Sequence, residues 1–257
     1  MTFIDTHAHL QWPDYKEDLP NIFERAKEAG VQKMVVVGTH ITNMDETLCV
    51  AESKKFLYAA LGIHPHDVKD LKEGDLETLE KKAHHKKVVA IGEIGLDYYY
   101  EHSPQDLQKE YFKKQIKIAQ KLKKPIIVHS REAEEDTYKI SKEVDASHNG
   151  GVMHCFTGSL PFALQMIELG FYISFTGIIT FKKKVEALQN VVKNIPLESM
   201  VLETDCPYLT PEPYRGKRNE PSYVRFTAEK IAELKGVSLE EVGKITTENA
   251  TKLFGLG

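Results

Sequence analysis

The sequence predicts an α/β fold of the βαβ type, because short β-branched runs alternate with longer stretches of helical periodicity along its 257 residues. Eight strands are expected, at 2–6, 33–38, 57–62, 88–93, 125–129, 150–155, 171–175 and 200–204. Eight strand–helix units in about 250 residues favour a closed (β/α)8 TIM barrel over an open sheet. No G-x-G-x-x-G sequence follows the first strand, which weakens the alternative of a doubly wound dinucleotide-binding sheet.

The stretches between the predicted strands carry helix signals. Segments 15–30 and 104–123 have apolar residues at three- to four-residue intervals. Gly30 closes the first segment and Pro125 follows the second, and both residue types stop helices. This alternation of strand and helix is what parallel pairing requires.

The end of the chain, 221–257, is predicted to form a pair of helices. Gly236 separates them, and Ser238 followed three residues later by Glu241 has the pattern of a capping box. The chain contains no linker rich in Pro, Gly or Ser and no low-complexity tract. One domain is therefore expected, over 1–257.

Composition narrows the classes of partner. The formal net charge of −4 provides no general attraction to nucleic acid or anionic membranes, so an anionic substrate would need local positive charge. No stretch approaches 18 apolar residues, and no signal-peptide pattern opens the chain. Three scattered cysteines form no disulfide framework. We expect a cytoplasmic protein with no membrane contact and no obligate protein partner.

A His-x-His pair, His7 and His9, ends the first predicted strand. Because side chains alternate along a strand, both imidazoles point to one face, with Cα atoms roughly 6.6 Å apart. Both can therefore reach one metal ion at about 2.0–2.1 Å.

Side chains that bind metals recur at the ends of other predicted strands. They are His64 after the third strand, Glu93 at the fourth, His129 at the fifth, His154 at the sixth and Asp205 at the eighth. The carboxyl ends of barrel strands meet at one mouth, so these groups are expected to converge with the His-x-His pair. Imidazoles with a carboxylate suit a divalent transition metal such as zinc, manganese or nickel. Glu93, central in strand order, is placed to bridge two such ions.

Seven motifs, in order and spanning nearly the whole chain, carry a specific resemblance. They are Phe3–His9, Gly62–His66, Gly92–Tyr98, Pro125–Arg131, His154–Gly158, Glu203–Pro211 and Arg215–Pro221. Through these motifs the sequence resembles the TatD family of metal-dependent deoxyribonucleases, within the amidohydrolase-like superfamily. Many other barrel hydrolases bridge their metals with a modified lysine, whereas the fourth strand here ends in Glu93, which favours the nuclease branch.

The resemblance implies a fold, a reaction and a ligand set. It implies two divalent ions, which could be zinc, manganese, nickel or magnesium, and hydrolysis of DNA phosphodiester bonds in a single strand or at an end. The implied ligands of the first ion are His7, His9, Glu93 and Asp205. The implied ligands of the second ion are Glu93, His129 and His154.

Several roles stay open at this point. Asp205 could accept the proton of an attacking water, or it could be a ligand only. His64 could contact the phosphate or protonate the leaving oxygen, or it could simply bond to backbone. Asp5 and Glu203, each two residues before a predicted ligand, are expected to contact the ligands and orient them.

The predicted substrate contacts lie outside the ligand set. Arg215, Lys217 and Arg218 follow the eighth strand and are expected to bind DNA phosphates, with a solvated loop as the alternative. The tyrosines of 98–100 could stack on bases or pack into the barrel rim.

Two cysteines adjoin predicted ligands but are not expected to bind metal. Strand alternation turns Cys155 away from the face of His154 and toward the helices. The same reasoning makes Cys206, beside Asp205, a weak candidate.

Two rival functions remain. The same metals could hydrolyse another ester or amide, such as the ester of an aminoacyl-tRNA or a cyclic amide. Alternatively, the protein could be a metal-binding scaffold without turnover. A scaffold need not keep a complete ligand set, and this chain has one, which favours an enzyme.

Overall fold

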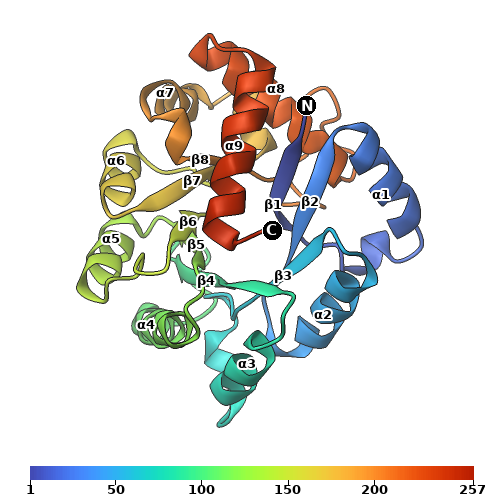
Figure 1. The fold of residues 1–257 in the computed structure, drawn as a ribbon. Helices are drawn as coiled ribbons and strands as arrows, with labels where there is room; N and C mark the ends of the chain where they lie inside the picture. Colours follow the sequence, from blue (N-terminus) through green and yellow to red (C-terminus); the bar gives the residue numbers. More distant parts are fainter.

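The computed structural model describes residues 1–257 and confirms the barrel. Its strands are β1 (Phe3–Ala8), β2 (Val31–Gly38), β3 (Leu57–Leu61), β4 (Val88–Asp97), β5 (Ile126–Arg131), β6 (Gly151–Met153), β7 (Phe171–Phe175) and β8 (Met200–Leu202). They pair in parallel in sequence order. A bridge between Ala8 and Cys206 joins the end of β1 to the segment after β8, so the sheet curves into a nearly closed ring (Figure 1).

Helices surround this ring, one after almost every strand (Figure 1). They are α1 (Leu19–Glu28), α2 (Met44–Ser53), α3 (Asp75–Ala83), α4 (Gln105–Leu122), α5 (Glu134–Glu143), α6 (Leu160–Glu168), α7 (Glu186–Asn194), α8 (Val224–Lys235) and α9 (Leu239–Phe254). Strands covered on both faces carry near-continuous apolar runs, as the buried residues of β2 and β3 do. None of these helices combines the length and apolar character needed to cross a bilayer.

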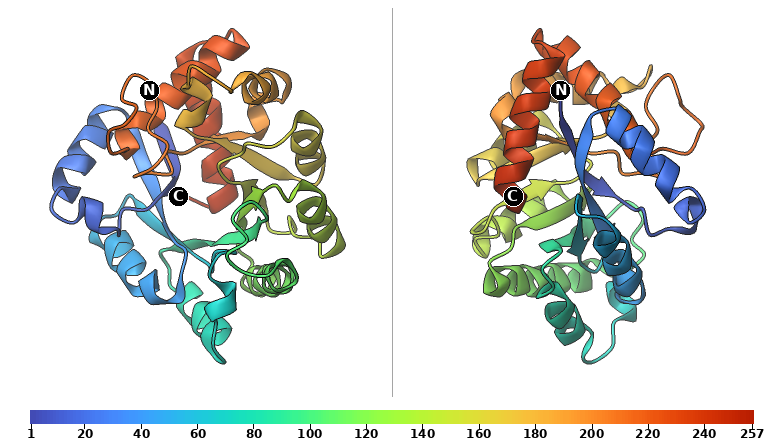
Figure 2. Two further views of the ribbon diagram at one scale, coloured as in Figure 1. Left: turned by 180° about the vertical axis from the view of Figure 1, so that it is seen from behind. Right: turned by 45° about the vertical axis from the view of Figure 1, so that its right-hand side comes forward.

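The last helix closes one end of the barrel. Phe254 and Leu256 pack against inward-facing residues such as Ile4 and Val201, near the amino ends of the strands. The view from behind shows the opposite end free of α9 (Figure 2). The carboxyl ends of the strands therefore open at the uncovered mouth.

The predicted carboxyl-terminal pair of helices is confirmed, and Ser238 caps the second helix, but without the return bond from the Glu241 side chain that a capping box has. The Ser238 hydroxyl accepts the backbone N–H of Glu241 at 3.1 Å and so caps α9. Gly236 ends α8 in the left-handed conformation, at φ 67°.

The ends of the strands differ from their predicted positions in a way that shapes the site. β4 continues to Asp97, whereas β6 and β8 stop at Met153 and Leu202. His154 and Asp205 therefore stand on loop backbone just beyond their strands, and Asp205 adopts a φ of 54°.

Candidate metal centre

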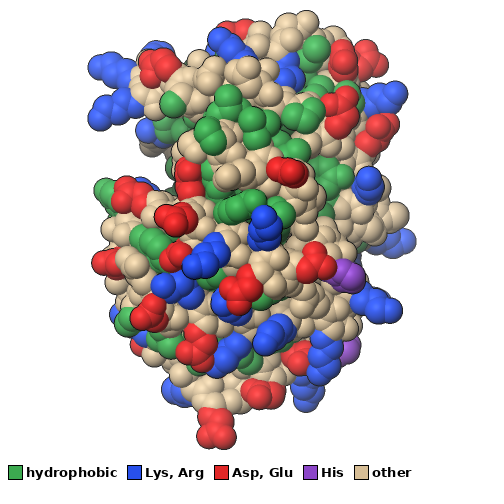
Figure 3. All heavy atoms as spheres, turned by 90° about the vertical axis from the view of Figure 1, so that its left-hand side faces the viewer, with side chains coloured by type: hydrophobic (Ala, Val, Ile, Leu, Met, Phe, Trp, Pro, Cys, Tyr) green, Lys and Arg blue, Asp and Glu red, His purple; other side chains and the backbone are tan.

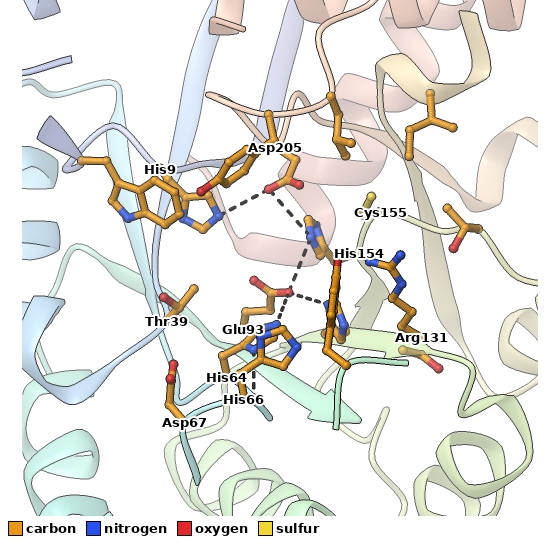
Figure 4. A pocket seen from close by; sticks show the side chains of 18 residues that line it. His9, Thr39, His64, His66, Asp67, Glu93, Arg131, His154, Cys155 and Asp205 are labelled. Carbon is orange, nitrogen blue, oxygen red and sulfur yellow. Dashed lines mark hydrogen bonds and ion pairs between the residues drawn. The ribbon is translucent and has the colours of Figure 1, made fainter. Parts of the chain in front are cut away.

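A pocket of about 860 Å³ opens at the carboxyl mouth of the barrel, and 18 residues line it. His64 and all the predicted metal ligands except His7 lie in its lining: His9, His64, Glu93, His129, His154 and Asp205. Glu93 and Asp205 face one another across it, with His9 to one side and His154 to the other (Figure 4). His7 is fully buried beside them.

One donor set surrounds a single point beside β1. The Nε2 atoms of His7 and His9 are 3.3 Å apart, and His9 Nε2 is 3.3 Å from Asp205 Oδ1. His7 Nε2 is 3.5 Å from Glu93 Oε2 and 3.8 Å from Asp205 Oδ1. Two donors at 2.0–2.1 Å from one tetrahedral ion would be about 3.3 Å apart, so these four groups fit one cation.

The tautomer of His9 is the one that a metal ligand requires. Its Nδ1 lies 2.9 Å from the carbonyl oxygen of Val37, which makes Nδ1 the protonated donor. The lone pair of Nε2 is then directed at the other donors, as a metal ligand requires.

The second oxygen of Glu93 faces a different group of imidazoles. Oε1 is 2.9 Å from His129 Nδ1, 3.4 Å from His64 Nε2 and 3.6 Å from His154 Nε2. One carboxylate thus offers one oxygen to each side, which is the arrangement of a bridging ligand. His64 lies beside these groups, although the ligand set implied by the family resemblance does not include it.

The two residues expected to orient the ligands behave differently. Glu203 Oε1 lies 2.9 Å from His154 Nδ1, an ion-pair contact rather than an aligned hydrogen bond. Asp5 does not touch an imidazole. Its carboxylate accepts the backbone N–H of His7 and both the N–H and the hydroxyl of Thr204, so it joins the end of β1 to the segment after β8.

Asp97 is a buried residue of the site that was not predicted from the sequence. Its Oδ2 lies 2.9 Å from His129 Nε2 and 3.0 Å from His66 Nε2. Its Oδ1 accepts the backbone N–H groups of Tyr99 and Tyr100. Asp97 therefore fixes the ring of His129 opposite Glu93, the supporting role that a carboxylate often has behind a metal-bound histidine.

We expect Asp97→Asn to weaken binding of a divalent ion on the His129 side of the centre by roughly 10- to 100-fold. The amide cannot accept from both imidazoles while also satisfying the backbone donors. Calorimetric titration of the metal-free protein with zinc measures this change. Asp106→Asn, whose side chain is 97 % exposed, is the matched control. If Asp97→Asn binds zinc as tightly as the unchanged protein, Asp97 does not support the metal centre.

Burial and mutual charge set the protonation of the cluster. Burial, together with the neighbouring His154, holds the pKa of His7 well below its usual value. Burial would raise the pKa of Glu93, but the imidazoles around it hold that pKa well below the ordinary range. Burial opposes the charging of His154, yet Glu203 and Glu93 raise its pKa to about 10. A cation held by His154 would have to displace its proton, so metal affinity should fall at lower pH.

Burial also lowers the pKa of His64, which keeps this imidazole neutral near pH 7. Its Nδ1 accepts the backbone N–H of His66 at 3.1 Å, so Nε2 carries the proton. His64 therefore presents a neutral N–H donor to the pocket.

The expected orientation of Cys155 is wrong. The residue lines the pocket beside His154, because β6 ends two residues earlier and strand alternation no longer applies. Its φ of 43° turns the backbone at this point. Cys206 is buried away from the pocket lining.

The predicted basic loop does not line the pocket. Arg218 is held by Asp18, with Nη2 2.6 Å from Oδ2, and lies over the ring of Tyr15. Arg215 and Lys217 are exposed further out.

The only Lys or Arg in the pocket lining is Arg131 at the end of β5, and sequence reasoning did not single it out. Its guanidinium lies 4.2 Å and 4.7 Å from the ring centres of Tyr99 and Tyr100 and has no carboxylate partner. Tyr98 packs at the rim, where its hydroxyl donates to Asp136. The rings of Tyr99 and Tyr100 thus hold the unpaired guanidinium of Arg131 in the pocket.

Comparisons with known proteins identify the family. The family "TatD related DNase" matches residues 4–255. The uncharacterized metal-dependent hydrolase YabD of Bacillus subtilis is 50% identical over 250 residues, covering 97% of this chain and 98% of that protein. The uncharacterized metal-dependent hydrolase YcfH of Escherichia coli is 39% identical, covering 99% and 96%.

Two solved structures that resemble this chain belong to the same family. The crystal structure of YjjV, a TatD homologue from Escherichia coli, superposes with a TM-score of 0.92 at 33% identity, covering 98% of each chain. A TatD family hydrolase from Entamoeba histolytica superposes with a TM-score of 0.90 at 26% identity, covering 100% of this chain and 99% of that one. The chain therefore belongs to the TatD family of metal-dependent hydrolases.

Proposed function

We propose that this protein hydrolyses phosphodiester bonds of DNA and acts on a single strand or a strand end. The observation that carries the proposal is Glu93, which presents one oxygen to each of two donor sets in a pocket that also holds one free guanidinium. A pair of divalent ions suits displacement at phosphorus. The name of the matching family, TatD related DNase, supports the same substrate.

Divalent ions held by these residues would lower the pKa of a bound water and neutralise charge on the phosphate. Of the two acidic ligands, Asp205 is the more exposed, with 14% of its side chain accessible against 5% for Glu93. Asp205 can therefore face a water in the pocket and accept its proton, while Glu93 remains enclosed by imidazoles. The neutral His64 donates its Nε2–H to a phosphate oxygen.

Charge on the protein surface supports a local rather than a general attraction to DNA. Lys and Arg are interspersed with Asp and Glu over most of the face drawn in Figure 3. Arg131 is then the cation nearest the chemistry, and Arg215 and Lys217 are free to meet phosphates further along the strand. Arg218 is occupied by Asp18 and serves the structure instead.

Removing the charge of Arg131 should weaken single-stranded DNA binding and flatten its salt dependence by about 0.7 in the slope of log K against log salt, the value for one lost phosphate contact. Arg131→Gln measured by fluorescence anisotropy between 50 and 200 mM salt tests this. Lys217→Gln tests the outer loop in the same way. Lys113→Gln, which removes an exposed ion pair with Glu143 on the helical shell, is the control. An unchanged slope for Arg131→Gln would exclude it as a phosphate contact.

The function itself is tested by incubating metal-free protein with a labelled single-stranded oligonucleotide, with and without added Mg²⁺, Mn²⁺ or Zn²⁺. The proposal predicts metal-dependent cleavage that EDTA abolishes. Aminoacyl-tRNA, a cyclic amide and a simple carboxylic ester serve as competing substrates. Turnover of one of these without DNA cleavage would overturn the proposal.

A further inference from the structure

We propose that Trp12 and Tyr208 form an aromatic wall that stacks an unpaired nucleobase beside the metal centre. This inference rests on the proposed function, because it identifies what part of a DNA strand the pocket selects. Both side chains line the pocket. Their rings meet edge to face, with centroids 5.3 Å apart.

The wall is joined to the metal centre by the chain itself. Trp12 follows the predicted ligand His9 by three residues, and Tyr208 follows Asp205 by three. In each case a turn ties the aromatic residue to the ligand: the Trp12 N–H donates to the His9 carbonyl at 3.2 Å, and the Tyr208 N–H donates to that of Asp205 at 3.0 Å. The indole also stacks on the His9 ring, with centroids 4.7 Å apart and an interplanar angle of 17°.

Contacts from the basic loop fix the two segments relative to each other. The side chain of Asn219 donates to the carbonyl of Thr204 at 2.9 Å and to that of Tyr208 at 2.5 Å. The Tyr15 hydroxyl donates to the Asn219 carbonyl at 2.5 Å. Arg218 binds the carbonyl of Asp14 and the carboxylate of Asp18, on the segment after β1. The wall is therefore held in place before any ligand binds, which lowers the entropy cost of stacking.

The chemistry of the wall favours a nucleobase. Tyr208 is 51% exposed, and the indole of Trp12, stacked on His9, lines the pocket beside it. Flat aromatic surface beside a phosphate-binding centre suits a planar ring that is linked to a phosphate. A base in a duplex is already stacked and paired, so only an unpaired base can use this wall without first leaving its stack.

Trp12 is the only tryptophan in the chain, so its fluorescence reports on the wall directly. The probes are thymidine 5′-monophosphate and 2-deoxyribose 5-phosphate, which share sugar and phosphate and differ by the base. Neither contains a phosphodiester to hydrolyse. Both are added to zinc-loaded protein, after a titration with zinc alone has set the baseline.

We expect thymidine 5′-monophosphate to change Trp12 emission saturably and to bind at least tenfold more tightly than the base-free sugar phosphate, as loss of about 1.4 kcal/mol of stacking would give. Tyr208→Ala should weaken the nucleotide about tenfold and leave the sugar phosphate unchanged, and Tyr208→Phe should restore binding. Leu164→Ala is the matched control, because Leu164 is a comparably exposed apolar side chain, 46% accessible, on α6 outside the pocket lining.

Equal affinities for the two probes would overturn the proposal that Trp12 and Tyr208 stack a base. A Tyr208→Ala variant that binds the nucleotide as tightly as the wild type would overturn it as well. DNA cleavage with equal probe affinities refutes the wall and leaves the proposed function standing. Base-dependent binding without DNA cleavage refutes the proposed function and leaves a nucleotide site.

Discussion

Glu93→Gln is expected to reduce the rate of hydrolysis by roughly 10³-fold or more, because several kcal/mol of charge stabilisation by two ions depends on this residue. The amide keeps the size of the side chain. It offers only one carbonyl oxygen, whereas Glu93 presents Oε2 to His7 and Oε1 to His64, His129 and His154. Bound metal should fall below two equivalents per chain, as measured by elemental analysis after dialysis.

Glu134→Gln is the matched control. Glu134 binds Ser159 in a separate groove between α5 and α6, so its loss should leave metal content and turnover unchanged. A Glu93→Gln protein that keeps two ions and near-normal turnover would show that the carboxylate is not a bridge.

Asp205→Asn should separate a proton acceptor from a simple ligand. The substitution keeps one oxygen near His7 and His9 but removes the negative charge and the basicity. If Asp205 accepts the proton of the attacking water, turnover should fall by about 10²–10⁴ while metal content is largely retained. Kinetics and metal analysis on the same preparation measure both quantities.

The two roles of Asp205 lead to different responses to added metal. A residue that is only a ligand would lose activity in proportion to metal content, and excess metal would restore turnover. Full rescue by metal would therefore contradict the assignment of Asp205 as the base.

The barrel and the convergence of the candidate ligands at one mouth were predictable from the sequence because both depend on local patterns. β-branched runs mark the strands, and His129 and Asp205 lie at or shortly beyond the ends of such runs. Parallel strands in sequential order bring their carboxyl ends together without further information.

Other features depend on where a strand stops, which local pattern does not decide. β4 continues to Asp97, four residues beyond Glu93, so both carboxylates lie on one face by the two-residue period of a strand. Because the strand was predicted to end at residue 93, nothing in the sequence placed Asp97 on the same face as Glu93. Conversely, β6 ends before His154, and the alternation applied to Cys155 failed for that reason.

Contacts between distant segments account for the remaining differences. Arg218 looks as free in the sequence as Arg215, yet Asp18, 200 residues away, neutralises it. Trp12 gains its place in the site only because the segments after β1 and β8 meet at the Ala8–Cys206 bridge. Contacts between segments so far apart in the chain cannot be predicted from the periodicity of the sequence.

The most direct test of the central claim is to titrate metal-free protein with a divalent ion while following hydrolysis of a single-stranded oligonucleotide in the same cuvette. Mn²⁺ suits the titration because the predicted ligands mix imidazole and carboxylate. The predicted result is cleavage that rises with bound metal and reaches its plateau at two equivalents per chain. Cleavage that needs no metal, or a fully loaded protein that leaves the strand intact, would contradict the assignment of this centre as a two-metal deoxyribonuclease site.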